Sequence, residues 1–300
     1  MDHKNYLEKF LREFDYPEEA REAYRAVYSA VESSPEHSAE INKAVEMLFE
    51  HQQDQEAILA ILASVADKVK IPAHTVKFYA FLIATHRLRR ELSEKGISEQ
   101  VIHNSLRDFR YKSDECHMFV GIYGSFSDSW LMGWFKGERL AFGRLQFEIT
   151  KLKYPTTLSG KEYSEADDVI GVHIPRSPDP FNREAQMEAY KLAYEHFKGS
   201  FSDKYIPFTC GSWLLFPYNK EILKPTSNTV VFAENYKILA SGPAEVWIRF
   251  IFGKLYNGNP DDLPEESSLH RGYKQYIKNG NIPGSGYGIF LFDGENVIKE

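Results

Sequence analysis

A short stretch near the middle of the chain, residues 142–149, alternates polar and apolar side chains. In a strand, successive side chains point to opposite faces. Three apolar side chains then share one face: Leu145, Phe147 and Ile149. Three polar side chains share the other face: Arg144, Gln146 and Glu148. Buried polar groups need partners, so the polar face is either the wet side of an edge strand or the lining of a polar cleft. The apolar opposite face and the nearby aromatic residues favour the cleft.

The first 110 residues repeat their apolar side chains at helical spacing. Prolines, glycines and polar clusters divide this region into predicted helices over residues 6–14, 17–33, 36–52, 55–69 and 75–94, with another beginning at Ser98. Connectors this short are typical of a helical domain. The longest apolar run, residues 78–84, is too short to cross a bilayer.

The composition changes near Lys112, where glycine, aromatic and β-branched residues become frequent. The pattern predicts a hairpin over 130–149, a loop over 154–166, and strands over 168–174, 208–216, 229–239 and 287–292. Helices are predicted over 182–197, 243–252 and 265–278, with helical turns over 217–223. Residues 168–216 read as strand, helix, strand, which indicates a right-handed crossover between parallel strands. The sequence therefore predicts an α+β protein, with an all-helical domain over 1–112 and a mixed-sheet domain with flanking helices over 113–300.

Charge and composition narrow the class of protein. The 300 residues are 43% hydrophobic and carry a formal net charge of -7, which argues against a nucleic-acid surface. The first five residues have no apolar signal core. The two cysteines form neither a disulfide framework nor a metal-ligand pattern. We expect a cytoplasmic protein with no metal and no membrane partner, acting on a small molecule or peptide.

His173 and Cys210 are the candidate proton-transfer and nucleophilic groups. His173 ends a predicted strand, where α/β sheets place ligands, and imidazole exchanges protons near neutral pH. The alternative is a strand-end histidine bonded to a neighbouring backbone group. If the crossover pairs the two strands, Cys210 could neighbour His173 and act as an activated nucleophile; the alternative is a small core residue.

Three further segments carry candidate chemistry. Ser212 and Trp213 follow Cys210 on the same predicted strand, and Tyr218 comes just after it. Tyr218 could protonate a leaving group, although a surface tyrosine is commoner. The glycines of 284–288 precede a strand, whereas phosphate loops follow one, so they read as a flexible start to the last strand.

Together these residues resemble a GNAT-like acyltransferase family. The resemblance rests on the segments Gly143–Glu148, Val172–Pro175 and Phe208–Leu215, with Ser227–Asn228 and the glycine-rich last strand. That family joins a helical N-acyltransferase N-terminal domain to a GNAT-like C-terminal domain. It implies an antiparallel meander followed by two parallel strands that splay apart, with an acyl-CoA inserted at the splay.

The resemblance implies acyl transfer from a CoA-type thioester to an amine. Glu148 or His173 would deprotonate the amine, and Tyr218 or Cys210 would protonate the departing thiolate. Substrate contacts would come from Arg144, Gln146, Ser212 and Trp213, although Arg144 could instead orient Glu148. Acyl-CoA would be a co-substrate, with no permanently bound cofactor.

The sequence departs from the family's pyrophosphate loop. Residues 175–181 contain three prolines and no glycine, and proline supplies no N–H donor. Arg176 could still pair with a phosphate. This loop favours the alternative function, a GNAT-derived module that binds a small molecule or peptide without CoA or catalysis.

Overall fold

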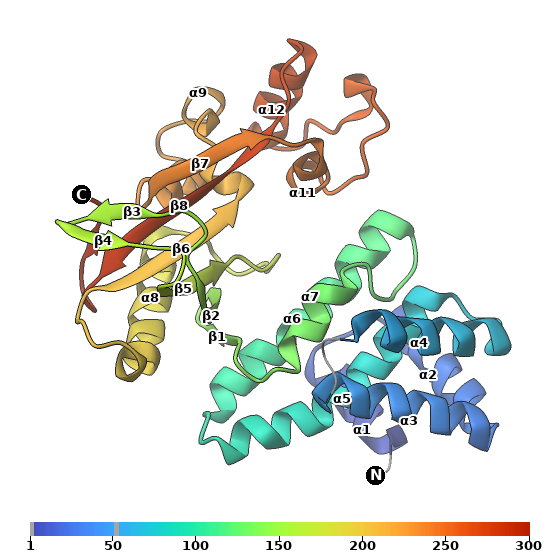
Figure 1. The fold of residues 1–300 in the computed structure, drawn as a ribbon. Helices are drawn as coiled ribbons and strands as arrows, with labels where there is room; N and C mark the ends of the chain where they lie inside the picture. Colours follow the sequence, from blue (N-terminus) through green and yellow to red (C-terminus); the bar gives the residue numbers. More distant parts are fainter. Residues whose placement is uncertain (1–2, 51–53) are drawn as a thin grey trace. The chain divides into compact units, whose positions relative to one another are not determined.

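The computed structural model describes residues 3–50 and 54–300. The chain divides into two compact units, residues 1–140 and 141–300. The change of unit therefore falls after the expected boundary near Lys112, which lies inside a helix (Figure 1). The end of the third predicted helix, at 51–52, lies outside the described residues.

The N-terminal unit is helical, as predicted. Its described helices are α1 (His3–Glu13), α2 (Glu18–Glu32), α3 (Pro35–Glu50), α4 (Gln55–Val69), α5 (Ala73–Glu94), α6 (Glu99–Val120) and α7 (Asp128–Trp134). Helix α5 packs against each of the other six helices, and its contact with α7 is the smallest of the six. Its apolar run from Phe78 to Ala84 is buried on every side, as expected of a helix that forms the middle of a core.

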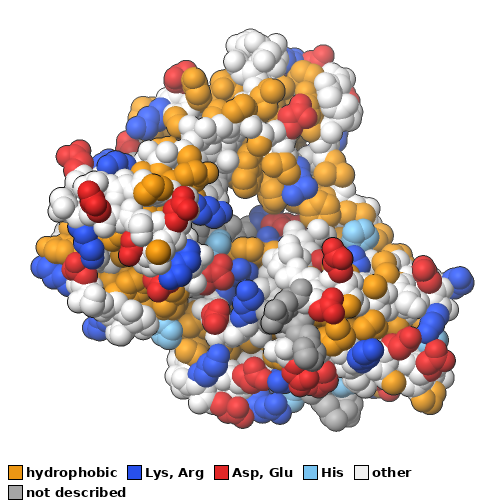
Figure 2. Space-filling view, in the orientation of Figure 1, with side chains coloured by type: hydrophobic (Ala, Val, Ile, Leu, Met, Phe, Trp, Pro, Cys, Tyr) orange, Lys and Arg blue, Asp and Glu red, His pale blue; other side chains and the backbone are white. Residues whose placement is uncertain are grey.

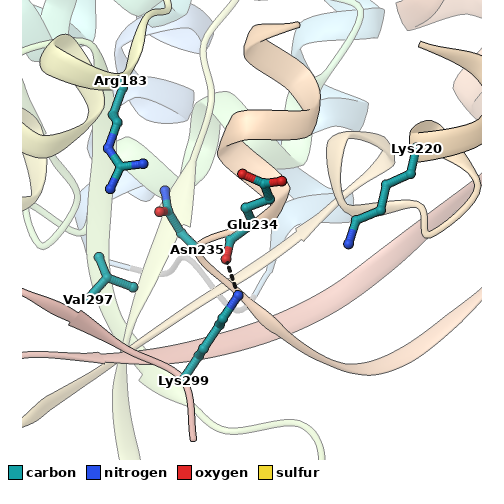
Figure 3. Close-up of a pocket in the computed structure, with 6 residues that line it drawn as sticks. All are labelled: Arg183, Lys220, Glu234, Asn235, Val297 and Lys299. Carbon is teal, nitrogen blue, oxygen red and sulfur yellow. Dashed lines mark hydrogen bonds between the residues drawn. The ribbon is translucent and has the colours of Figure 1, made fainter. Parts of the chain in front are cut away.

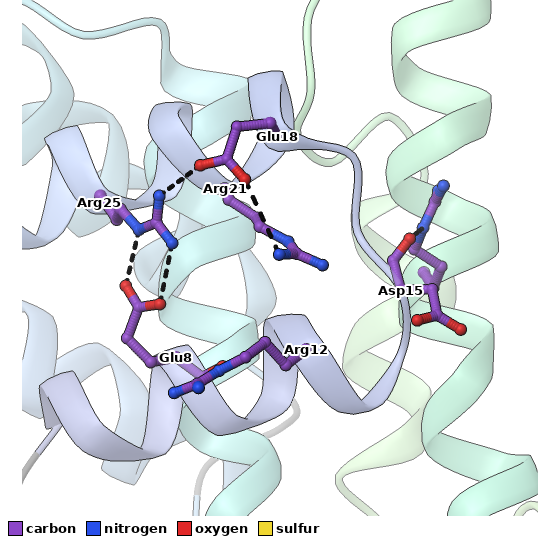
Figure 4. A network of polar contacts seen from close by, with 7 residues as sticks. Glu8, Arg12, Asp15, Glu18, Arg21 and Arg25 are labelled. Carbon is purple, nitrogen blue, oxygen red and sulfur yellow. Dashed lines mark hydrogen bonds and ion pairs between the residues drawn. The ribbon is translucent and has the colours of Figure 1, made fainter.

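Ion pairs join α1 to α2 on the surface of this unit (Figure 4). Arg25 donates to both carboxylate oxygens of Glu8, at 2.7 and 3.0 Å, and to Glu18 at 2.6 Å. The pKa of Glu8 is lowered, chiefly by its hydrogen bond with Arg25. Exposed pairs of this kind contribute little stability, so they set the helix orientation more than the fold.

The predicted hairpin over 130–149 is wrong in its first half. Trp130 and Trp134 lie on α7, where both indole N–H groups donate to the buried carboxylate of Asp108, at 2.7 and 2.9 Å. Aromatic residues favour strands only where a sheet can receive them. Here tertiary contacts with α6 fix a helix instead.

The C-terminal unit is built on one mixed sheet with the strand order β1-β2-β5-β6-β8-β7, and β9 pairs with β8. Its strands are β1 (Leu140–Phe142), β2 (Leu145–Lys151), β5 (Asp168–His173), β6 (Ile206–Ser212), β7 (Lys237–Pro243), β8 (Gly284–Phe292) and β9 (Val297–Ile298). A separate hairpin consists of β3 (Thr156–Leu158) and β4 (Lys161–Tyr163). Only β5 and β6 pair in parallel among the registered neighbours of the described sheet, as the crossover predicts.

Helix α8 (Arg183–Phe197) makes the crossover and covers one face of the sheet. Asn182 caps it by accepting the N–H of Ala185 at 3.0 Å. Tyr190 of α8 packs on three aromatic rings of that face, those of Phe147, Phe208 and Phe290. The β3–β4 hairpin contributes Leu158 and Tyr163 to a second cluster that includes Val169 and Ile289. The sheet is therefore buried on both sides over much of its length.

Shorter elements complete this unit: α9 (Asn219–Ile222), α10 (Asn228–Ala233), α11 (Ile248–Phe252) and α12 (Ser268–Lys278), with 3₁₀ turns at Lys198–Ser200, Trp213–Leu215, Glu245–Trp247 and Pro260–Asp262. Two predictions are wrong here. The loop over 154–166 contains the β3–β4 hairpin, and the strand over 229–239 is helix α10 followed by β7. Ser227 starts that helix by accepting the N–H of Val230, a capping signal that outweighs the β-branched composition.

The surface of this unit is mixed in charge but apolar around α11 and α12 (Figure 2). The exposed large aliphatic side chains of this unit are Ile149, Leu192, Val246, Leu255 and Ile282. None of the helices in the described ranges is long and apolar enough to span a membrane.

The glycines of 284–288 belong to β8 itself, so the expected flexible start to the last strand is wrong. A Cβ atom on Gly286 would lie 2.2 Å from the carbonyl oxygen of Leu215, and one on Gly288 would lie 2.8 Å from Cβ of Tyr236. The strand needs glycine because neighbouring backbone lies directly against it.

We predict that Gly286→Ala lowers the free energy of unfolding by about 2 kcal/mol or more, because a backbone carbonyl must move. The control is Gly199→Ala, where a Cβ would meet nothing within 4 Å; it should be neutral or slightly stabilising. Urea denaturation followed by circular dichroism measures both. Equal midpoints for the two variants would contradict the close approach.

Candidate active site

The polar stripe of β2 faces His173 of β5. The antiparallel register places Gln146 opposite His173 and Glu148 opposite Gly171. Residues directly opposite each other lie on the same face of a sheet. The structure therefore brings Glu148, Gln146 and His173 together on one face.

Glu148 and His173 form a direct hydrogen-bonded pair. Nε2 of His173 lies 2.9 Å from Oε1 of Glu148, and the two side chains are 30% and 23% exposed. The contact is diagonal across the strands and passes over Gly171, whose missing Cβ would lie 3.6 Å from the same nitrogen. A glycine at this point of the strand leaves room for the imidazole to lean back onto the carboxylate. The carboxylate can thus orient the ring.

This pair lies where two strands separate. The parallel register of β5 with β6 covers Ile170–Phe208 and Gly171–Thr209, and it ends there although both strands continue. Strand β6 stays paired with β8 as far as Ser212. His173 is therefore on the opening edge of β5, and the exposed Gly211 is on the facing part of β6.

Cys210 is not near His173, so the expected juxtaposition is wrong. Gly171 is paired with Thr209, which puts Thr209 on the His173 face and Cys210 on the other. Cys210 is 2% exposed, and burial raises the pKa of its thiol. Which of the two residues shares the face of His173 depends on the register of β5 against β6, and the sequence does not fix that register. Cys210 is a core residue, and we do not assign it a covalent role.

Thr209 and Tyr287 join the polar face instead. Tyr287 is paired with Gly211, and its phenol oxygen accepts the backbone N–H of Lys153 at 3.4 Å. Burial raises the pKa of Tyr287, and a hydrogen bond with Thr209 partly offsets this. Sequence reasoning missed both residues. Two sequence signals point to these residues. Alternation along β6 places Thr209 on the face opposite to that of Cys210, and Tyr287 stands between two glycines.

Arg144 holds the proline-containing loop after β5. Its guanidinium donates to three backbone carbonyls, those of Asp179 at 3.1 Å, Pro175 at 3.0 Å and Ser177 at 3.4 Å. Arg144 therefore fixes the position of this loop, and the expectation that it also binds substrate or orients Glu148 stays a prediction. Arg176 is exposed, and its side chain reaches the carbonyl of Phe250 at 3.5 Å.

Ser212, Trp213 and Tyr218 lie apart from the pair, whereas Gln146 shares the face of Glu148 and His173. Ser212 caps a 3₁₀ turn by accepting the N–H of Leu214, and Trp213 packs on Tyr273. Tyr218 is 48% exposed. Gln146 is 1% exposed, and its amide oxygen has no hydrogen-bond partner in the described chain. No group of three possible metal ligands occurs within residues 3–50 and 54–300.

Comparison with known proteins defines the class. Residues 5–137 match the N-acyltransferase N-terminal domain, and residues 140–290 match the GNAT-like C-terminal domain. The chain therefore belongs to the family that joins these two domains. The resemblance seen in the sequence and the predicted α+β fold class are confirmed.

Solved structures share this fold over most of the chain. One is an acyltransferase in complex with CoA and 10C-teicoplanin, with a TM-score of 0.73. Another is a mutant acyltransferase in complex with octanoyl-CoA, with a TM-score of 0.72. Both are 22% identical to this chain and cover 94% of it and 86% of their own length. No curated protein sequence matches the chain.

We predict that neither cysteine reacts quickly in the folded protein. Burial raises the pKa of Cys116 to about 12 and that of Cys210 as well, so the thiolate fraction near neutral pH is very small. Alkylation should be at least about a hundredfold slower than in urea, where both thiols are released. Mass spectrometry with iodoacetamide counts the labelled sites. Fast native labelling of Cys210 would restore it as a nucleophile.

Proposed function

We propose that this protein transfers an acyl group from a CoA-type thioester to an amine acceptor. The observation that carries the proposal is the Glu148–His173 pair at the edge where β5 and β6 part. Backbone groups that face each other there are no longer paired between the strands. They can receive the amide-containing arm of CoA as an added strand. Membership of the acyltransferase family supports the same reaction class.

The proposed mechanism uses the pair as the base. With Nε2–H donating to Glu148, the acceptor nitrogen of His173 is Nδ1. It takes the proton of the amine while the amine nitrogen attacks the thioester carbonyl and the C–S bond breaks. The thiolate then takes up a proton, which leaves an amide and a free CoA thiol. Glu148 stabilises the imidazolium that forms.

We propose Tyr287 as the proton donor to the thiolate, in place of the expected Cys210. Its phenol is protonated near neutral pH, as an unshifted tyrosine also is, and burial raises its pKa further. Its partner Gly211 is on the opening part of β6, across from His173. Tyr218 stays a second candidate for this step. The base would then act from β5 and the acid from β8, whose Tyr287 is paired with Gly211 of β6.

The donor class follows from the fold relatives. Acyltransferases of this fold have been solved with octanoyl-CoA and decanoyl-CoA, and one with decanoyl-CoA and teicoplanin. We therefore propose medium-chain acyl-CoA as the first donor to test. The acceptor is proposed only as an amine on a small molecule or peptide.

One observation favours the second function, a binding module without CoA. The N–H groups of Ser177 and Asp179 are used inside the loop after β5, at 2.9 and 3.1 Å, and three of its seven residues are prolines. This loop offers few donors to a pyrophosphate. The two functions differ in whether acyl-CoA binds and whether CoA is released.

We predict that decanoyl-CoA binds to the wild-type protein in isothermal titration calorimetry, whereas decanoate alone binds much more weakly. Heat with the thioester supports the acyltransferase, because the strand opening recognises the CoA arm. Absence of heat with acetyl-CoA, octanoyl-CoA and decanoyl-CoA alike would favour the binding module.

We predict that Glu148→Gln and His173→Asn each lower kcat for CoA release by about a hundredfold or more, with small effects on the dissociation constant of decanoyl-CoA. The reason is that proton transfer, not binding, is removed. Glu162→Gln, an exposed carboxylate on β4, is the control and should retain activity. The assay follows the CoA thiol with a panel of amines. Full activity in both site variants would rule out the pair as the base.

A further inference from the structure

The C-terminal unit contains a polar cavity away from the Glu148–His173 pair, formed by the beginning of α8, by α9, by the end of α10 and by the residues around β9. Its volume is about 370 Å³. Six residues line it: Arg183, Lys220, Glu234, Asn235, Val297 and Lys299 (Figure 3). None of them was a candidate for chemistry in the sequence, because they come from four separate segments.

Three cations surround this cavity with little to neutralise them. The side chains of Arg183 and Lys220 are exposed and make no hydrogen bond or ion pair within the described chain. Lys299 donates only to a backbone carbonyl, that of Glu234, at 2.8 Å. The single carboxylate of the lining is that of Glu234. Three positive groups collected around one cavity create a field that favours an anion.

A buried donor points to the same kind of ligand. Asn235 is 7% exposed, and its Nδ2 makes no hydrogen bond of standard geometry within the described residues, although its side chain also interacts with the buried phenol of Tyr190. In Figure 3 the Asn235 amide extends toward the side of the cavity where the Arg183 guanidinium lies. Two donor groups on one side of a cavity, one of them buried, favour an acceptor between them. This observation is independent of the surface charges.

The chemistry of the lining selects a phosphate group. Guanidinium and ammonium groups together bind a phosphate through charge-assisted hydrogen bonds. The cavity is larger than a single phosphate needs and can admit part of the molecule that carries it. We infer that this cavity binds a phosphate group through Arg183, Lys220 and Lys299.

The phosphate can have two sources. One is the nucleotide end of CoA, and this source rests on the proposed function. It would supply the charge recognition that the proline-containing loop cannot give with backbone N–H groups. The other is free phosphate, which would make the cavity a separate anion site.

The first experiment measures phosphate binding directly. Inorganic phosphate should raise the melting temperature of the wild-type protein more than sodium chloride at equal ionic strength. Arg183→Ala and Lys220→Ala should each weaken this binding by about tenfold. Glu234→Gln should tighten it about threefold, since a repelling charge is removed. Lys191→Ala, an exposed cation on α8 outside the cavity, is the matched control and should behave as wild type.

The second experiment separates the two sources by calorimetry with CoA and 3′-dephospho-CoA. If the cavity takes the 3′-phosphate, CoA binds more tightly than dephospho-CoA in the wild type but not in the Arg183→Ala, Lys220→Ala double variant. If the ligand is free phosphate, the two cofactors bind alike and phosphate still stabilises the protein when CoA is present.

The inference fails if phosphate stabilises the protein no more than chloride, or if the double variant responds as the control does. Because the phosphate measurement needs no thioester, it stands even if the protein binds no acyl-CoA. If the wild-type protein binds phosphate but transfers no acyl group, the result counts against the proposed function and not against the phosphate site.

Discussion

The pairing of β6 with β8 holds the C-terminal sheet together at the place where β5 departs. It runs from Ile206–Phe292 to Ser212–Gly286 without interruption, while the parallel pairing with β5 ends after Gly171–Thr209. An opening between neighbouring strands costs hydrogen bonds on both sides. It persists because β6 keeps its other edge satisfied. The glycines of β8 permit this, since they let the backbone that follows β6 fold directly against the strand.

The alternation of polar and apolar residues along β2 is sufficient to find, from the sequence alone, the side of the site formed by β2 and β5. The stripe of Arg144, Gln146 and Glu148 and the strand-end position of His173 were both recognisable, and the structure brings Glu148 and His173 into contact. The opposite side was not predictable. A shift of one residue in the register of β5 against β6 would put Cys210 on the polar face in place of Thr209. Nothing local in either strand fixes that parity.

Other errors arose where tertiary contacts outweighed local preference. Trp130 and Trp134 read as strand residues, yet a buried carboxylate on α6 receives their indole N–H groups and holds a helix there. Arg144 has a contact that the polar stripe alone does not predict. Its position on the polar stripe was right, but three loop carbonyls compete for its guanidinium. A loop without glycine can thus be ordered by a side chain from the sheet beneath it.

Gly171 has a wider meaning for how such chains diverge. The imidazole reaches Glu148 across Gly171, where a Cβ atom would lie 3.6 Å from Nε2 of His173. Strands ordinarily favour valine or isoleucine at a buried position of this kind. A branched residue there would satisfy the strand and leave both titratable groups in the sequence, while separating them in space. Reactivity in a descendant could therefore disappear through a change at a residue with no chemistry of its own, while its ability to hold a ligand persists.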